Sequence, residues 1–568
     1  AVGELRWLPE GDPFRMPGRA ARPAAAVAPA PAPPAFAAPE GEAERLLAGL
    51  WAELLRAPRI GRQDNFFALG GDSIIALQVA ARAASAGWTV PAQAVFTRQT
   101  LAELAGAAAP KAAGDARRGG EEAGAILLTP IQRWFFELGL AQPDHWNQSM
   151  LLVTPPDFDL ARCRAALEGI AARHEGLRLR YRQGPAGWGV SREGSAGGVA
   201  LEVRPLPDLA AGIAAAQGGL SLAEGPLLRA VYFEGKAGGE GRLFLAAHHV
   251  AIDGVSWRIL LDDLTALYAG GFTAPAPDWS AWAREVAGEA LRPEVAAQLD
   301  FWRGLAADPP LPRDFEAAGR GRGGDESTVV SRLPAEGTGL LLRELGAVHR
   351  AHIDEILAGA LFWALREWTG REALTLAIER HGREELGALP APAETLGWFT
   401  NLHPVRIAAA GERSAAAAVR DAKEALRGVP AKGIGYGLLR YLGPADARAV
   451  LGSQPWPELC FNYLGRFEGS ASGGFRAAPE ARGVDRHPAN ARPFLIEINA
   501  GVQDGILECG WTYSRAHHRP ETIFRLADRF TGALTQLIAG GGALAAPSDF
   551  SAGGLSQSDL EKVLSRLR

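Results

Sequence analysis

Hydrophobic residues recur at helical spacing in three short segments near the N-terminal end of the chain. The segments lie at residues 46–55, 73–86 and 100–107. Apolar positions at i, i+3, i+4 and i+7 are typical of amphipathic helices. Pro58 and Gly61 end the first segment, and Gly87 ends the second. Three or four helices in about 70 residues make a small all-α domain, which we expect to be a four-helix bundle at residues 40–107.

A much longer region, residues 124–550, alternates helical and strand-like patterns. It is too long for one hydrophobic core, so the sequence predicts an α/β domain of two lobes, at about 124–300 and 301–550. The candidate strands are 148–153, 177–182, 228–234, 242–247, 373–378, 402–407, 458–463 and 494–500. The candidate helices are 159–173, 256–269, 291–305, 338–350, 353–368, 413–427 and 520–538.

Three segments lack the apolar groups that a core needs. Residues 18–40 are rich in Pro and Ala, so we interpret residues 1–39 as a linker with a remnant of a preceding domain. Residues 108–123 are rich in Ala, Gly and charge and predict a second linker. Residues 551–568 are predicted to form a C-terminal tail or docking segment with a short capped helix.

Composition narrows the functional classes. The net charge is −5 and no basic stripe is visible, which argues against a nucleic-acid partner. Cys163, Cys460 and Cys509 are widely spaced and form neither a metal motif nor a disulfide framework. No apolar stretch is long enough to span a bilayer, and the first residues lack the features of a secretory signal. We therefore expect a cytoplasmic protein without a membrane partner.

One serine stands where a glycine loop enters a predicted helix. The sequence is Gly70-Gly71-Asp72-Ser73. The positive end of a helix dipole favours a phosphate ester at such a serine. Asp72 or Ser73 could equally serve only as the helix cap, and the residues alone leave both interpretations open.

A histidine pair follows a predicted strand, in the sequence AAHHVAIDGVSW at 246–257. Successive strand side chains point to opposite faces, so we expect one of His248 and His249 to face a cleft and act as an acid or base. A metal site lacks a third ligand at a useful spacing, and a packing role also remains open. Asp253 is expected to orient the loop by pairing with an arginine, Arg229 or Arg383.

Both motifs resemble those of nonribosomal peptide synthetases. DNFFALGGDSIIALQ at 64–78 resembles the peptidyl carrier signature, which implies that Ser73 carries 4′-phosphopantetheine. HHxxxDG resembles the condensation superfamily, which implies two chloramphenicol-acetyltransferase-like lobes around a tunnel. By position, the resemblance makes His249 the active-site histidine and gives His248 and Asp253 structural roles near the site.

Within that superfamily the chain resembles the epimerization domains. Seven motifs occur in order between residues 129 and 496: TPIQRWF, the histidine loop with VSWRIL, ERHGRE, TLGWFTN, GIGYG, FNYLGR and PFLI. A cyclisation domain would carry an aspartate in place of His248. The resemblance places Glu379 opposite His249 as a second acid–base group. It assigns Asn462 and Tyr463 to polar stabilisation or proton relay. Tyr463 as a packing residue, and Glu379 in a surface ion pair with Arg380 or Arg383, are the alternatives.

The resemblance implies that the domain is an isomerase and that it is part of a multifunctional enzyme of antibiotic biosynthesis. Its substrate is an L-aminoacyl or peptidyl thioester, which it converts to an L/D mixture by removing and returning the Cα proton, without metal or PLP. The implied partners are an upstream adenylation domain, a downstream condensation domain and a phosphopantetheinyl transferase. A condensation domain that forms peptide bonds, and a catalytically silent interaction platform, are the alternative functions.

Overall fold

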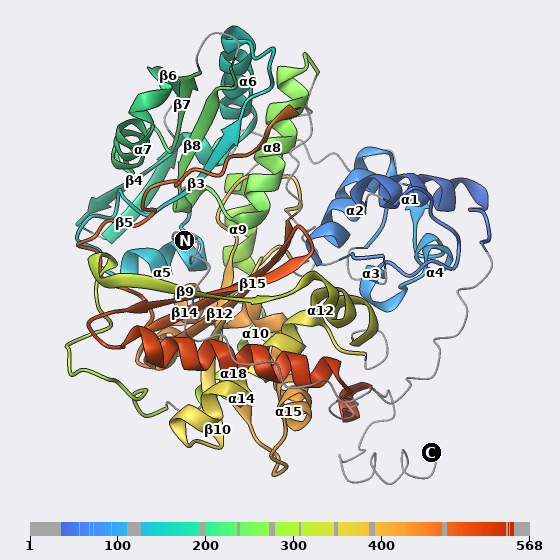
Figure 1. The fold of residues 1–568 in the computed structure, drawn as a ribbon, viewed down its shortest axis with the longest axis vertical. Helices are drawn as coiled ribbons and strands as arrows, with labels where there is room; N and C mark the ends of the chain where they lie inside the picture. Colours follow the sequence, from blue (N-terminus) through green and yellow to red (C-terminus); the bar gives the residue numbers. More distant parts are fainter. Residues whose placement is uncertain are drawn as a thin grey trace, which may run out of the picture.

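The structure is a computed structural model (Figure 1). It describes residues 36–110 and 126–549, except for 56, 68, 72, 92–93, 186, 193–198, 236–238, 272–275, 277–278, 306–307, 346–349, 385–391, 468–473, 541–543 and 545. The tail predicted at 551–568, most of the segment 1–39 and most of the linker 108–123 lie outside the described residues.

The N-terminal unit is a small helical bundle. Its helices are α1 (Gly41–Leu54), α2 (Ser73–Ser85), α3 (Ala94–Thr97) and α4 (Leu101–Ala105), and the two-residue strands β1 (Trp88–Thr89) and β2 (Ala109–Pro110) pair beside them. Leu47, Trp51 and Phe66 are fully buried at its centre. Leu47 belongs to the predicted apolar face of the first helix, whereas Phe66 comes from the loop before α2, and their burial holds the helices together.

The first lobe is built on a sheet of strand order β13-β3-β8-β7-β6. The strands are β3 (Asn147–Val153), β6 (Ala200–Pro205), β7 (Leu228–Glu234), β8 (Arg242–His248) and β13 (Arg476–Ala477). Helix α7 (Leu209–Gly218) packs on β7, and helices α6 (Leu160–Arg173) and α8 (Gly254–Tyr268) pack together. The hairpin β4 (Leu179–Gly184) and β5 (Gly187–Arg192) and helices α5 (Pro130–Glu137) and α9 (Trp279–Glu289) complete this lobe.

The second lobe has a sheet of order β11-β10-β12-β14-β15-β9. The strands are β9 (Glu326–Leu333), β10 (Ala373–Arg380), β11 (Asn401–Ala408), β12 (Leu459–Phe467), β14 (Ile496–Gln503) and β15 (Ile506–Ser514). Helices α14 (Ile353–Thr369), α15 (Ala415–Arg427) and α18 (Pro520–Ile538) pack against one another and cover one face of the sheet (Figure 1). The remaining helices are α10 (Pro293–Ala296), α11 (Leu299–Arg303), α12 (Ala335–Leu340), α16 (Ile434–Tyr441) and α17 (Ala445–Gly452).

One strand from the second half of the chain belongs to the first lobe. Strand β13 pairs with β3, with Arg476 opposite Val153. The chain then forms an isolated bridge between Arg486 and Trp146 before it returns to β14. This crossing segment brings Arg486 to the boundary between the lobes.

The predicted two-lobed α/β architecture is therefore confirmed, and every candidate strand overlaps an observed one. The prediction of one helix at 291–305 is wrong, because this segment forms two short helices, α10 and α11. The helix predicted at 338–350 covers the end of α12 and a π-helical turn at Leu341–Leu345. Among the described residues, no helix combines the length and apolar character needed to cross a bilayer.

Candidate active site

The loop before Ser73 is tightly built. Gly70 has φ +97°, which lies in the region that favours glycine. A Cβ on Gly71 would clash with the ring of Phe66. Ser73 follows as the first residue of α2, which continues to Ser85. A serine at the start of a helix of this length suits a phosphate ester, so the local backbone fits the attachment of phosphopantetheine.

The bundle contacts the two-lobed domain beside this loop. Arg466 of β12 donates a hydrogen bond from Nη1 to the carbonyl of Gly70 at 2.9 Å. Arg258 of α8 in turn donates to the carbonyl of Arg466 at 2.8 Å. Because α8 belongs to the first lobe and β12 to the second, the serine loop sits where the two lobes meet. Figure 1 shows the bundle beside the lobes at this level.

The two histidines have different surroundings, as strand alternation predicts. His248 is fully buried, with Nε2 2.8 Å from the carbonyl of Pro143 and Nδ1 accepting from the backbone N–H of Val250. His249 is partly exposed and places Nδ1 2.8 Å from the carbonyl of Ile252. Burial lowers the pKa of each histidine to about 4. Both rings are therefore neutral at pH 7, and of the two histidines His249 is the one with part of its surface exposed.

Asp253 joins the lobes. It caps α8 by accepting from the N–H of Ser256 at 2.7 Å, and it accepts from the N–H of Phe399 at 3.1 Å. Arg383, which follows β10 and is fully buried, donates to the same carboxylate at 2.9 Å. Of the two arginines expected from the sequence, Arg383 makes the pair, whereas Arg229 donates to the carbonyl of Gly219.

Glu379 lies on the sheet face that is turned toward the first lobe. Two residues earlier in the register, Ala377 pairs with Cys460, and both belong to the hydrophobic cluster of the first lobe. Glu379 pairs with Asn462, and Asn462 pairs with Asn499 on the next strand. Side chains in one row of a sheet share a face. Carboxyl and carboxamide groups therefore form a polar row that faces the lobe carrying His249.

The arginines proposed as surface partners of Glu379 are bound elsewhere. Arg380 pairs with Asp354 at 3.0 Å, and Arg383 pairs with Asp253. The structure therefore contradicts the alternative in which Glu379 serves a surface ion pair with either of them.

The pKa of the Glu379 carboxyl is raised to about 7, first by burial and second by the negative charge of Glu497. Burial opposes ionisation of Glu497 as well, but the guanidiniums of Arg486 and Arg492 outweigh it and lower the pKa of Glu497 to about 2. Arg486 binds that carboxylate through both terminal nitrogens, at 2.9 and 2.8 Å. Asp253 acts on both acid–base groups, since its charge raises the pKa of Glu379 and of His249.

Tyr463 is separated from this row. It pairs with Ala500, one position beyond the pair of Asn462 with Asn499, so alternation turns it to the opposite face. There it packs, partly buried, against the core of the second lobe. This placement turns Tyr463 away from Asn462 and favours the packing alternative.

Two side chains that no motif signalled lie at this site. Gln148 of β3 approaches Nε2 of His249 to 3.0 Å, and Asn499 of β14 extends the polar row of Glu379. The sequence does not signal these two residues. Each becomes the neighbour of a motif residue only when strands that are distant in sequence pair. Among the described residues, no group of three or more His, Cys, Asp or Glu side chains is arranged to hold a metal ion.

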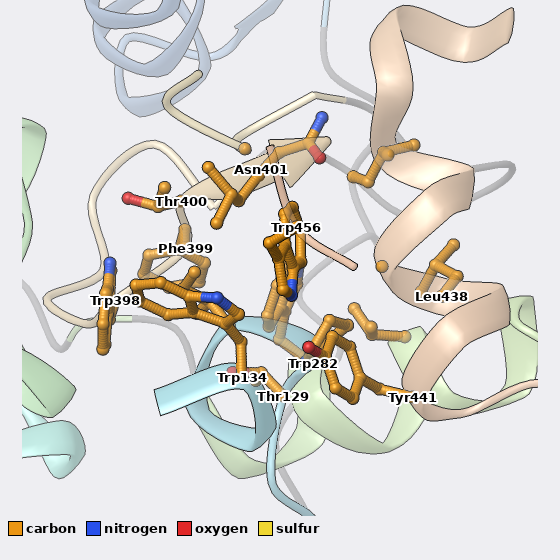
Figure 2. Close-up of a pocket in the computed structure, with 17 residues that line it drawn as sticks. Thr129, Trp134, Trp282, Trp398, Phe399, Thr400, Asn401, Leu438, Tyr441 and Trp456 are labelled. Carbon is orange, nitrogen blue, oxygen red and sulfur yellow. The ribbon is translucent and has the colours of Figure 1, made fainter. Parts of the chain in front are cut away.

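An apolar pocket has one lining residue in contact with His249 and another paired with Glu379 (Figure 2). Trp398 lines the pocket and packs against the His249 ring, with ring centroids 4.1 Å apart and the ring planes tilted by 31°. Leu402 also lines it and is the cross-strand partner of Glu379. Figure 2 shows Trp134 and Trp456 on the same pocket. Apolar walls exclude water, which strengthens electrostatic interactions within the site.

Two family profiles match the chain. The profile described as "Phosphopantetheine attachment site" matches residues 45–108, and the "Condensation domain" profile matches residues 122–545. The chain belongs to the condensation-domain family. Its condensation-type domain is preceded by a carrier domain, whose family attaches 4′-phosphopantetheine covalently.

Relatives of this condensation-family protein are peptide synthetases. Chondramide synthase cmdD of Chondromyces crocatus is 36% identical over 94% of this chain, and tyrocidine synthase 2 of Brevibacillus parabrevis is 33% identical over 93%. The chain covers 14% and 15% of the length of these two relatives, respectively.

Solved structures agree with the two-lobed fold. The epimerization domain from the third module of tyrocidine synthetase B is 30% identical, with a TM-score of 0.68, and covers 73% of this chain and 97% of that domain. The SgcC5 protein of Streptomyces globisporus is 19% identical, with a TM-score of 0.60, over 74% of this chain and 99% of that protein, which supports the fold alone.

Proposed function

We propose that the condensation-family domain inverts the Cα centre of an aminoacyl or peptidyl thioester carried on Ser73. The observation that supports this proposal is that two candidate acid–base groups come from different lobes. Glu379 belongs to the second lobe and His249 to the first, and the lobes are joined through Asp253 and Arg383. Inversion requires proton removal on one face of a carbon and proton return on the other, which two opposed groups can provide.

The chemistry suits the protonation states. A thioester makes the neighbouring Cα–H acidic, because sulfur donates little electron density to the carbonyl. A neutral His249 can take the proton from one face, and a protonated Glu379 can return one to the other face. The reverse reaction uses Glu379 as the base and the imidazolium as the acid. Each positioned acid–base group contributes about 10²–10⁴-fold to the rate.

The polar row of Glu379, Asn462 and Asn499 can stabilise the anion that forms when the Cα proton leaves. When the Cα proton leaves, negative charge develops on the thioester oxygen of the cargo. Asn462 and Asn499 carry amide N–H donors in the row of Glu379. Donors fixed in a site that excludes water stabilise such charge. We assign this role to Asn462, with Asn499 behind it, and we leave Tyr463 outside the chemistry.

The deciding experiment follows the stereochemistry. We would load Ser73 with an L-aminoacyl phosphopantetheine arm in heavy water, using a phosphopantetheinyl transferase, then release the cargo and measure its D:L ratio and Cα deuterium. We expect a D/L mixture with deuterium at Cα. Ser73→Ala is the loading control and should carry no cargo. Purely L cargo without deuterium, across several amino acids and a short peptide, would refute the proposal.

Peptide-bond formation is the second candidate, because the matching family is named for condensation. That reaction needs a second loaded carrier, whereas inversion needs none. A loaded chain that stays L when alone, and forms a peptide only when a second loaded carrier is added, would favour condensation. A chain that does neither would favour a silent platform.

Carrier docking through Arg466 gives a separate prediction. Arg466→Glu replaces a donor to the Gly70 carbonyl by an acceptor, so the hydrogen bond is lost and repulsion takes its place. A hydrogen bond from a charged group contributes about 1.5–3 kcal/mol, which corresponds to about tenfold or more. We expect the inversion rate of the loaded chain to fall about tenfold, with unchanged loading of Ser73. Arg476→Glu, an exposed arginine on β13, is the matched control. An unchanged rate in Arg466→Glu would show that this contact does not matter for docking.

A further inference from the structure

A chain of hydrogen bonds runs through the side chain of Gln148 to His249. The indole N–H of Trp257 on α8 donates to Oε1 of Gln148 at 2.8 Å. Nε2 of Gln148 lies 3.0 Å from Nε2 of His249, and Nδ1 of His249 lies 2.8 Å from the carbonyl of Ile252. Strand β3 holds Gln148 in place, because its pairing partner on β8 is Ala247, two residues before His249.

The direction of every bond in this chain is determined. An indole N–H only donates, so the Gln148 atom that faces Trp257 is the oxygen, and the amide nitrogen faces His249. A backbone carbonyl only accepts, so the hydrogen of a neutral His249 ring sits on Nδ1. Nε2 of His249 therefore carries the lone pair, and an amide N–H of Gln148 donates to it.

We propose that Gln148, oriented by Trp257, is a positioning residue that fixes His249 in its Nδ1–H tautomer and opposes protonation at Nε2. This inference rests on the proposed function, since it concerns the base that takes the Cα proton. When that proton reaches Nε2, it takes the lone pair that accepted the Gln148 N–H, so that hydrogen bond breaks, and the electron pair of the broken C–H bond passes to the thioester carbonyl. Nε2–H then faces an N–H of Gln148, so two donors oppose each other. The imidazolium is held weakly and returns its proton readily.

The other charged groups around the ring do not supply this effect. Asp253, at the start of α8, favours the imidazolium, and its charge is balanced by Arg383. Glu379 lies on β10 across the lobe boundary, and His248 is buried and bound to Pro143. Trp398 contributes only an uncharged aromatic ring, tilted by 31° against the imidazole. Gln148 is the group that meets Nε2 itself.

The first test reads the tautomer directly. In the full chain with ¹⁵N-labelled histidine rings, long-range proton–nitrogen spectra distinguish a protonated Nδ1 from a protonated Nε2, and His249→Asn assigns the signals. We expect the Nδ1–H form of His249 at pH 7. An Nε2–H form would overturn the proposal. This readout needs no cargo and no turnover, so it stands even where no inversion is found.

The second test reverses the group at Nε2. Gln148→Glu presents a carboxylate that accepts from the imidazolium, and an opposite charge at this range raises the pKa of a histidine by about 1–3 units. The ring of His249 should then titrate at higher pH. The ratio of the inversion rate at pH 5 to that at pH 8 should fall, by about twofold for a rise of one unit and about tenfold for a rise of two. Gln183→Glu makes the same change at an exposed site on β4 and should leave both readouts unchanged.

Trp257→Phe provides an independent variant. Without the indole donor, the Gln148 amide can turn its oxygen toward Nε2, so the titration of His249 should again move to higher pH. A merely structural role for Gln148 would lower the rate equally at every pH without moving the titration of His249. That result in the folded variants, checked by circular dichroism, would overturn the proposal.

Discussion

Glu379→Gln and His249→Asn are each expected to slow inversion of the loaded cargo by about 10²–10⁴-fold. Each variant removes one proton-transfer group while keeping a polar side chain of similar shape. Glu379 is held in β10 by pairing with Leu402 and Asn462 on either side, so the change to Gln leaves the sheet intact. Inversion is measured as the D:L ratio of released cargo against time.

Deuterium uptake makes the same variants more informative. With one base left, the enzyme can remove and return a proton on one face only. Each variant should therefore exchange Cα hydrogen of one enantiomer with solvent while leaving its configuration unchanged. The enantiomer should differ between Glu379→Gln and His249→Asn, which identifies the base that serves the L form.

The matched control is Glu367→Gln, an exposed carboxylate on α14 that pairs with Arg529. It should invert cargo at the normal rate. Normal inversion in both single active-site variants, with Ser73 loaded and the fold intact, would refute the assignment of two bases.

Apolar runs made much of the fold predictable. Strands β7 and β8 lie in mostly apolar segments and match their predicted ranges closely. Strand β9 was missed because its side chains are mostly half-buried at the edge of the sheet, which gives a weak pattern. Residues 291–305 have an uninterrupted helical periodicity, so local sequence carries no signal for the break between α10 and α11.

The candidate site residues that lie in sequence motifs could be predicted from the sequence. His249, Asp253, Glu379 and Asn462 come from motifs, and the structure brings them to the boundary of the lobes. Gln148 and Asn499 could not be found this way, because their roles depend on strand register: β3 beside β8, and β14 beside β12. Tyr463 follows Asn462 directly, and strand alternation sends such neighbours to opposite faces.

The pH dependence of inversion follows from a proton that the two bases share. In each direction, one of His249 and Glu379 must be protonated and the other must be unprotonated. Both directions therefore need the pair to carry one proton in total. The pKa of His249 is lowered to about 4 and that of Glu379 is raised to about 7. Between these values the pair holds one proton, and coupled groups titrate as a pair.

The rate constant of inversion should therefore be level between about pH 5 and 6.5 and fall above pH 7, where Glu379 loses its proton. Mass action gives a tenfold loss per pH unit, so the rate at pH 9 should be about 100-fold below the plateau. Loaded L and D cargo should show the same alkaline limb. A rate that stays constant from pH 7 to 9, or limbs that run in opposite senses for the two enantiomers, would contradict the shared proton.

Glu497→Gln tests the cause of the alkaline limb. The negative charge of Glu497 raises the pKa of Glu379, so its removal should move the limb to lower pH and reduce the rate at pH 7 more than at pH 5.5. Arg486 keeps Glu326 as a partner in this variant, at 3.4 Å. Glu508→Gln, which alters a paired glutamate on the neighbouring strand β15, should leave the limb in place. An unmoved limb in folded Glu497→Gln would mean that Glu379 is not the group that titrates, because this carboxylate is the largest charged influence on it after burial.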